Sequence, residues 1–114
     1  MSENDCVFCQ IVRGEIDSEV VHEEEEVLAF QDVGGQAPVH VLVIPKQHIS
    51  SLAEIGSVSD GVAKRLFEVA HEVAKKMDIA ASGYAFRINK GPDSGQEVFH
   101  LHGHVMGGRK LEMP

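Results

Sequence analysis

The sequence has few cysteines, no long hydrophobic run and a shortage of positive charge, and each shortage excludes a class of protein. Two cysteines are too few for the disulfide framework of a small secreted domain. Apolar stretches such as Val41–Ile44 are far too short to cross a bilayer. Ten basic against 18 acidic residues give a formal charge of -8, the wrong sign for non-specific attraction to nucleic acid or to an anionic membrane. We therefore expect no nucleic-acid or membrane partner.

The first residues also lack the features of a secretory signal. Residues 1–5 are polar and acidic, where a signal needs positive charge followed by an apolar segment. Together with the small number of cysteines, this predicts a protein of the reducing cytoplasm.

The remaining composition is that of an ordinary globular domain. The 114 residues are 43% hydrophobic and 25% charged, which argues against a disordered or fibrous protein. No repeat or low-complexity linker divides the chain. We therefore predict one domain over residues 1–114.

The hydrophobic period changes twice along the chain. Short apolar runs predict strands at residues 19–22, 27–30 and 40–44. Apolar residues then recur at spacings of three, four and seven, which predicts a helix over about residues 59–78. After Gly83 the period returns to two, which predicts strands at 84–89 and 98–106. Strands in succession around one long helix predict an α+β domain with a mostly antiparallel sheet.

Histidine is the unusual residue, because there are seven and three of them, His100, His102 and His104, fall within five positions. Side chains alternate along a strand, so these three would share one face, with about 6.6 to 7 Å between successive positions. Burying an imidazole without a partner costs free energy, so three in register favour a functional site over a solvated strand face. Two chemistries fit the spacing: a metal site, or nucleophilic catalysis by one ring that its neighbours orient.

A loop with two glycines leads from Asn89 into the histidine strand. Residues 91–96 read Gly-Pro-Asp-Ser-Gly-Gln, and glycines let backbone N–H groups approach an anion closely. A glycine loop by itself is weak evidence, since most merely turn the chain. Joined to the histidines, it predicts a phosphate beside an imidazole that attacks phosphorus and forms a phosphoramidate intermediate, which water then hydrolyses.

Several motifs together resemble the histidine triad (HIT) family, in particular its Hint branch of nucleotide phosphoramidases. Residues 100–106 are similar to the triad motif of alternating histidine and hydrophobic positions, and Gly107-Gly108-Arg109 after it is similar to the Hint branch. Further similar segments lie within residues 6–16, 28–32, 36–49 and 89–99. The resemblance implies a HIT-like fold of roughly five antiparallel strands with one long and one short helix. It also implies a homodimer in which two sheets join.

The same resemblance implies roles for individual residues. His102 would be the nucleophile, His104 and Asn89 would contact the phosphate or the leaving group, and His40 would support the nucleophilic ring. Asp32 would bind the ribose, although an aspartate just after a strand is more commonly a turn former. Backbone groups of residues 95–98 and the Gln96 amide would line the phosphate site, and apolar residues that also suit an ordinary core would form the base pocket. The implied nucleotide-binding set is Val7, Phe8, Ile11, Ile16, Phe30, Asp32, Val33, Asn89, Gly95, Gln96, Glu97, Val98, His102 and His104.

Cys6-x-x-Cys9 is half of a tetrahedral Cys₂His₂ zinc site, with reduced, metal-free thiols as the alternative interpretation. Some HIT relatives bind structural zinc in this way, and the resemblance implies Cys6, Cys9, His48 and His100 as ligands. Such a zinc, one per chain, would not be catalytic, because protein would fill all four positions. No organic cofactor is expected.

The resemblance implies an enzyme that acts at the α-phosphate of purine nucleotides through a nucleotidyl-histidine intermediate, above all an adenosine 5′-phosphoramidase that hydrolyses a P–N bond. Two alternatives stay open: a dinucleoside polyphosphate hydrolase, and a nucleotide- or zinc-binding regulatory module. Gly107-Gly108-Arg109 favours the phosphoramidase over the first alternative. Gly103 departs from the triad, which calls for a hydrophobic residue there. Lys46, Arg87 and Arg109 are candidates to offset charge near the site.

Overall fold

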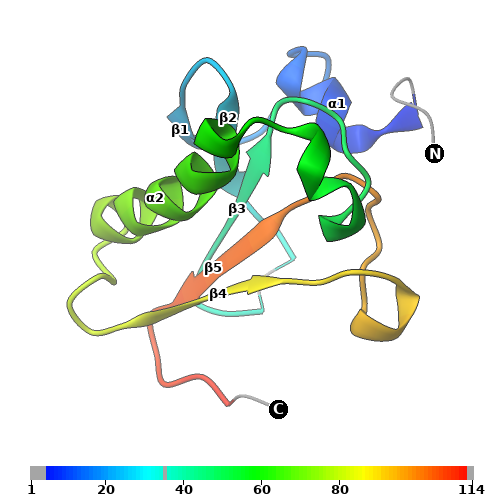
Figure 1. The fold of residues 1–114 in the computed structure, drawn as a ribbon. Helices are drawn as coiled ribbons and strands as arrows, with labels where there is room; N and C mark the ends of the chain where they lie inside the picture. The colour runs from blue at the N-terminus through cyan, green and yellow to red at the C-terminus, as the bar shows by residue number, and fades with distance from the viewer. Residues whose placement is uncertain (1–4, 35, 113–114) are drawn as a thin grey trace.

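The computed structural model describes residues 5–34 and 36–112 and contains the predicted five-stranded antiparallel sheet. The order of strands in the sheet is β1-β2-β3-β5-β4, so β5, which carries His104, lies between β3 and β4 (Figure 1). The strands are β1 (Val20–Glu23), β2 (Val27–Gln31), β3 (Val39–Pro45), β4 (Tyr84–Ile88) and β5 (Gly103–Gly107).

The long helix α2 (Asp60–Lys76) covers one face of the sheet (Figure 1) and lies where the period predicts it. Ser59 caps it, because its hydroxyl accepts the backbone N–H of Val62 at 3.1 Å. The apolar stripe of α2 packs on alternate residues of the sheet. This core includes Val62, Leu66, Val69, Ala70, Val73 and Ala74 of the helix and Val27, Ala29, Val41, Val43 and Val105 of the strands.

The short helix α1 (Val7–Val12) packs through a second cluster on the other residues of β2 and β3. The Sγ atom of Cys6 caps this helix by accepting the backbone N–H of Cys9 at 3.4 Å. The cluster joins Cys6, Phe8 and Cys9 to Leu28, Phe30, Leu42 and Ile44. One long and one short α-helix are thus confirmed, and two short 3₁₀ helices, η2 (Leu52–Ser57) and η3 (Pro92–Ser94), were not predicted. Over the residues that the structure describes, every helix is too short or too polar to span a bilayer.

The histidine strand begins later than predicted. β5 pairs with β3 only from Gly103, opposite Val43, so His100 and His102 precede the strand. The ladder stops near Pro45 because proline has no N–H to donate. Residues 98–102 are therefore not a strand, and the backbone N–H of Leu101 instead donates to the carbonyl of Ile49 at 2.8 Å.

Gly103, the departure from the triad pattern, makes room for an aromatic ring. A Cβ atom at this position would lie 2.3 Å from two ring carbons of Phe86 on β4. Phe86 in turn packs edge-on against Phe67 of α2, with ring centroids 5.5 Å apart. The missing side chain at residue 103 is thus replaced by Phe86 in the core between the sheet and α2.

Candidate active site

One row of side chains crosses the sheet on the face that α1 covers. Phe30 on β2 lies opposite Leu42 on β3, Leu42 lies opposite His104 on β5, and His104 lies opposite Arg87 on β4. Neighbouring strands are about 4.8 Å apart, so the row extends over about 14 Å. Phe30 forms the apolar end of this row, and Arg87 forms its cationic end.

A cavity of about 270 Å³ lies along this row and brings many of the predicted site residues together. Predicted residues in its lining are Phe8, Asp32, Asn89, Gly95, Glu97, Val98, His102 and His104. Arg87, a candidate to offset charge near the site, lines it as well, and so do Gln36 and Leu42, which were not predicted as site residues. Leu42 alternates with His40 along β3, so the sequence contained a signal for it. The direction of the Arg87 side chain follows only from the register of β4 on β5.

Other residues expected in the nucleotide pocket lie outside this lining. Ile11 and Ile16 line a separate hollow beside Leu28. Phe30 is buried behind Phe8, with ring centroids 5.4 Å apart. Val33 is 99% exposed, and Val7 also lies at the surface.

The Gln96 side chain is buried and holds the glycine loop together. Its Oε1 accepts the backbone N–H of Gly91 at 2.8 Å, and its Nε2 donates to the carbonyls of Ser50 and Val98 at 2.9 and 3.1 Å. The amide is therefore occupied by backbone groups in this arrangement and shapes the wall formed by Gly95 and its neighbours.

His102 is a buried histidine, and one of its ring nitrogens is already hydrogen-bonded. Its Nδ1 lies 2.7 Å from the carbonyl oxygen of His100, so Nδ1–H donates and Nε2 keeps its lone pair. Burial lowers the pKa of His102 and so favours the neutral ring. The edge contact with Phe8, at 5.1 Å between centroids, confines the imidazole further. A neutral ring with a free lone pair, lining a cavity, can act as a nucleophile.

The contact of His40 is with His104 rather than with His102. His40 Nε2 lies 2.8 Å from His104 Nδ1 and 3.4 Å from Asp32 Oδ2. The carboxylate favours a proton on His40 Nε2, which then donates to His104 and leaves His104 an Nε2–H. Burial, reinforced by His102 and His40, lowers the pKa of His104 to about 4. His104 is thus a neutral donor in the cavity at neutral pH.

Asp32 has the role of a turn former that the sequence also suggested. Its Oδ1 accepts the backbone N–H of Gly34 at 2.7 Å. Its other oxygen lies near His40 and belongs to the cavity lining, so one carboxylate both shapes the turn after β2 and faces the histidines.

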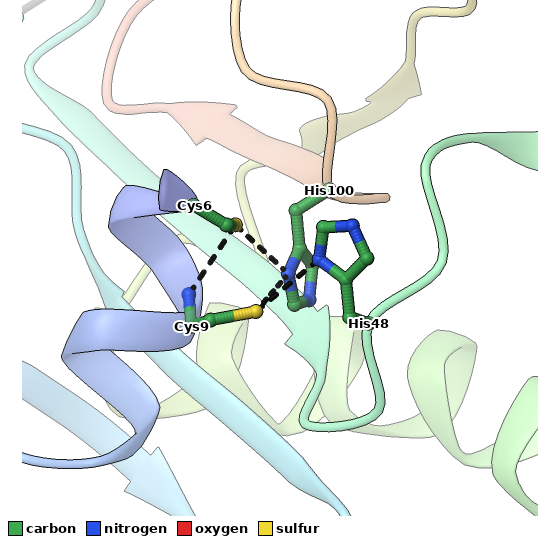
Figure 2. A group of neighbouring side chains, drawn as sticks. All are labelled: Cys6, Cys9, His48 and His100. Carbon is green, nitrogen blue, oxygen red and sulfur yellow. Dashed lines mark hydrogen bonds between the residues drawn. The ribbon is translucent and has the colours of Figure 1, made fainter. Parts of the chain in front are cut away.

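A second cluster joins Cys6 and Cys9 at the start of α1 to His48 and His100 (Figure 2). Its ligand atoms all lie within 4.8 Å of one another. Cys9 Sγ is 3.2 Å from His48 Nδ1, and Cys6 Sγ is 3.4 Å from His100 Nδ1. The four residues lie close enough to hold one metal ion.

The protonation of His100 suits a metal ligand. Its Nε2 lies 2.8 Å from the carbonyl oxygen of Pro45, so this nitrogen carries the proton and donates. Nδ1, on the side of the sulfur atoms, then keeps its lone pair, which is the usual arrangement of a ligating histidine. Two thiols and two imidazoles are a donor set that zinc prefers.

A comparison with protein families identifies the domain. The model of the HIT domain matches residues 13–111. This chain belongs to the HIT family. The histidines around the cavity are therefore the triad region of a HIT protein.

Relatives of this HIT protein include an uncharacterised HIT-like protein of Synechococcus elongatus, 44% identical over 100% of this chain and 98% of the relative. The purine nucleoside phosphoramidase of Escherichia coli is 37% identical over 92% of this chain and 88% of its own length. Among solved structures, a HIT family hydrolase from Clostridium thermocellum has a TM-score of 0.91 and 40% identity, and covers 96% of both chains. This HIT protein is accordingly a hydrolase with the HIT fold.

Proposed function

We propose that this HIT hydrolase is an adenosine 5′-phosphoramidase with His102 as its nucleophile. The observation that carries the proposal is the hydrogen bond from His102 Nδ1–H to the carbonyl of His100, which leaves Nε2 free on a ring that lines the cavity. The Escherichia coli relative, a purine nucleoside phosphoramidase, supports the same reaction class.

The reaction divides into two displacements at the α-phosphorus. His102 Nε2 forms a bond to phosphorus as the P–N bond breaks, and the electron pair leaves with the amine nitrogen, which takes a proton from solvent. The nucleotidyl-imidazolium keeps its Nδ1–H on the carbonyl of His100. Water then attacks phosphorus, releases the nucleoside monophosphate and a proton, and returns His102 to its neutral form.

Neighbouring groups stabilise the charge that these steps develop. The Nε2–H of His104 and the Asn89 amide supply donors for phosphate oxygens or for the leaving nitrogen. The backbone of Glu97 and Val98 supplies further N–H groups in the same wall, whereas the N–H groups of Gly95 and Gln96 donate to the carbonyls of Pro92 and Gly91. Asp32 is the candidate partner of the ribose hydroxyls. Phe8, with Phe30 behind it, forms the apolar wall for the base.

Trapping the intermediate tests the function directly. The protein is mixed with adenosine 5′-phosphoramidate, quenched in acid-free denaturant and mapped by mass spectrometry, and we expect an adenylyl group on His102. We also expect His102→Ala to bind AMP but to lose at least about a thousandfold in turnover, as for removal of other covalent nucleophiles. Surviving turnover in this variant, or an adduct elsewhere, would contradict the assignment.

A ranking of substrates separates the alternatives. We expect adenosine 5′-phosphoramidate to be hydrolysed with a higher kcat/KM than diadenosine polyphosphates. The reverse ranking would identify a dinucleoside polyphosphate hydrolase, and nucleotide binding without turnover of either substrate would identify a binding module.

We propose zinc as the metal of the Cys6, Cys9, His48 and His100 cluster. When bound, the ion would tie the start of α1 to His100, whose carbonyl orients His102. Elemental analysis of protein purified without chelator should give about one zinc per chain, the count for one closed four-ligand site. A content far below this value would overturn the proposal.

We propose that the protein works as a cytoplasmic homodimer. Cys6 and Cys9 are not joined by a disulfide, which suits a reducing compartment. β4 lies at one edge of the sheet, and Phe67 beside it on α2 is 62% exposed, so a second copy has both backbone groups and an apolar side chain to cover. Light scattering should report a dimer that Phe67→Asp weakens, and a monomeric wild-type protein would contradict this proposal.

A further inference from the structure

Arg87 carries a positive charge that no other residue in the described part of the chain neutralises. Its Nε atom is buried and has no hydrogen-bond partner. Within residues 5–34 and 36–112, no ion pair includes Arg87, although the side chain lines the catalytic cavity. A buried cationic donor without a partner costs free energy, which an anionic ligand would recover.

The position of Arg87 relates it to one part of the substrate. In the row across the sheet, the apolar end at Phe30 and the cation at Arg87 lie on opposite sides of His104. With the base at the apolar end and the α-phosphate at the histidines, a group that reaches Arg87 lies beyond the phosphorus atom. Arg87 therefore lies on the side of the leaving group.

A second hollow continues from the catalytic cavity at this point. It has a volume of about 180 Å³ and shares Gln36 and Arg87 with that cavity. Arg109 adds another cation to its lining, and its guanidinium donates to the carbonyls of Lys110 and Gln36, at 3.2 and 3.4 Å. Glu112 is the acidic group in the same lining, so the hollow has two cations against one carboxylate. Space and charge together suit an anionic leaving group.

We propose that Arg87 determines specificity by binding a negatively charged group on the leaving amine. This inference rests on the proposed phosphoramidase function and narrows its substrate class to nucleoside phosphoramidates whose amine carries a carboxylate or a phosphate. Arg87 holds that anion while His102 Nε2 bonds to phosphorus and the P–N electron pair leaves with the amine. Its planar fork of donors suits both oxyanions.

Two substrates that differ only in charge test the proposal. They are adenosine 5′-phosphoramidates joined through nitrogen to glycine, which has a free carboxylate, and to glycinamide, which does not. We expect the wild-type protein to prefer the glycine compound by about tenfold or more in kcat/KM, the value of one hydrogen bond to a charged group. Arg87→Gln should abolish the preference by lowering kcat/KM for the glycine compound much more than for the glycinamide compound, while Arg87→Lys should retain part of the preference.

The control is Lys64→Gln, which removes the same charge from an exposed position of α2 and should keep the preference. Equal losses of kcat/KM on both substrates in Arg87→Gln would show a merely structural role and overturn the proposal. A wild-type protein without any preference would overturn it as well, while its hydrolysis of glycinamide would leave the phosphoramidase function intact.

If no phosphoramidate is hydrolysed, measurements of nucleotide affinity still test the anion site at Arg87 separately from the phosphoramidase function. Calorimetry compares AMP with ADP, whose β-phosphate stands in for an anionic leaving group. We expect Arg87→Gln to weaken ADP by about tenfold, again the value of one charged hydrogen bond, and to leave AMP unchanged. That result without turnover would refute the phosphoramidase function but retain the anion site, and equal ADP affinities in both proteins would refute the anion site.

Discussion

The Nδ1 atom of His102 lies 2.7 Å from the carbonyl oxygen of His100, so a residue of the Cys6, Cys9, His48 and His100 cluster also orients the proposed nucleophile. His100 is itself held on its other side, because its Nε2–H donates to the carbonyl of Pro45. The structural cluster and the cavity are therefore joined by one peptide segment. Disturbing the first should change the geometry of the second.

Loss of a proposed zinc ligand should slow turnover without removing a group that touches the substrate. We expect Cys9→Ser to lower kcat by about tenfold or more, the usual size of effects on groups that orient a catalytic residue, and to change KM less. The variant should also have a lower Tm than the wild-type protein. Steady-state kinetics and thermal unfolding check both expectations. The control is His71→Gln, at an exposed position of α2. Unchanged kcat would separate the cluster from catalysis.

Gly103→Ala should destabilise the protein because the new methyl group enters the space of Phe86. The 2.3 Å approach to two ring carbons is an overpacking defect inside the core, which costs about 1–3 kcal/mol in free energy of unfolding. Gly56→Ala, with open space around its added Cβ, is the matched control. Urea unfolding measures both, and Phe86→Leu should recover part of the loss in the double variant. Equal stability of both alanine variants would contradict the packing argument.

His104 should stay neutral in weakly acidic solution. Its folded pKa, lowered to about 4 mainly by burial, lies below the ordinary value of 6.5. As the pH decreases below 6.5, His104 of the unfolded chain becomes protonated, whereas folded His104 stays neutral until about pH 4. This residue therefore lowers the free energy of unfolding as the pH decreases from 6.5 to about 4. Ring ¹⁵N shifts should show neutral His104 at pH 5.5. Titration near pH 6.5 would contradict its burial.

Glu24 should contribute to stability above acidic pH through its paired contact with Arg65. Arg65 Nε and Nη2 each donate to this carboxylate at 2.9 Å, and that contact lowers the pKa of Glu24 to about 2. We expect Glu24→Gln to cost about 1 kcal/mol near pH 7, because the pair is partly exposed.

The Glu24 contribution has a defined pH window. A depressed carboxyl pKa stabilises the fold above the unfolded value near 4.5, and the contribution is lost as the pH falls toward about 2. The difference between wild-type and Glu24→Gln in urea unfolding should therefore shrink across this window. Glu68→Gln, whose carboxylate is 3.7 Å from Arg65 and more exposed, should have a smaller effect. A constant difference down to pH 2 would contradict the ion-pair explanation.

Local pattern determined much of this protein. The period of apolar residues predicted the strands and α2, because burial of one face imposes a spacing of two on strands and about 3.6 on helices. The spacing of Cys6 and Cys9, with the HIT resemblance, predicted that these two residues would lie beside His48 and His100. The same motifs identified the residues at the centre of the cavity, including His102 and His104.

Only the tertiary structure decided how strands meet. The pairing of β4 with β5 places Arg87 opposite His104, and no local pattern contains that register. Pairing likewise gave His40 the partner His104, ended the β5 ladder near Pro45 and set Phe86 against Gly103. These contacts join residues far apart in the chain, so they depend on hydrogen-bond register and on shared core volume. The sequence by itself determined the chemical groups of the site, and the fold decided which of them touch.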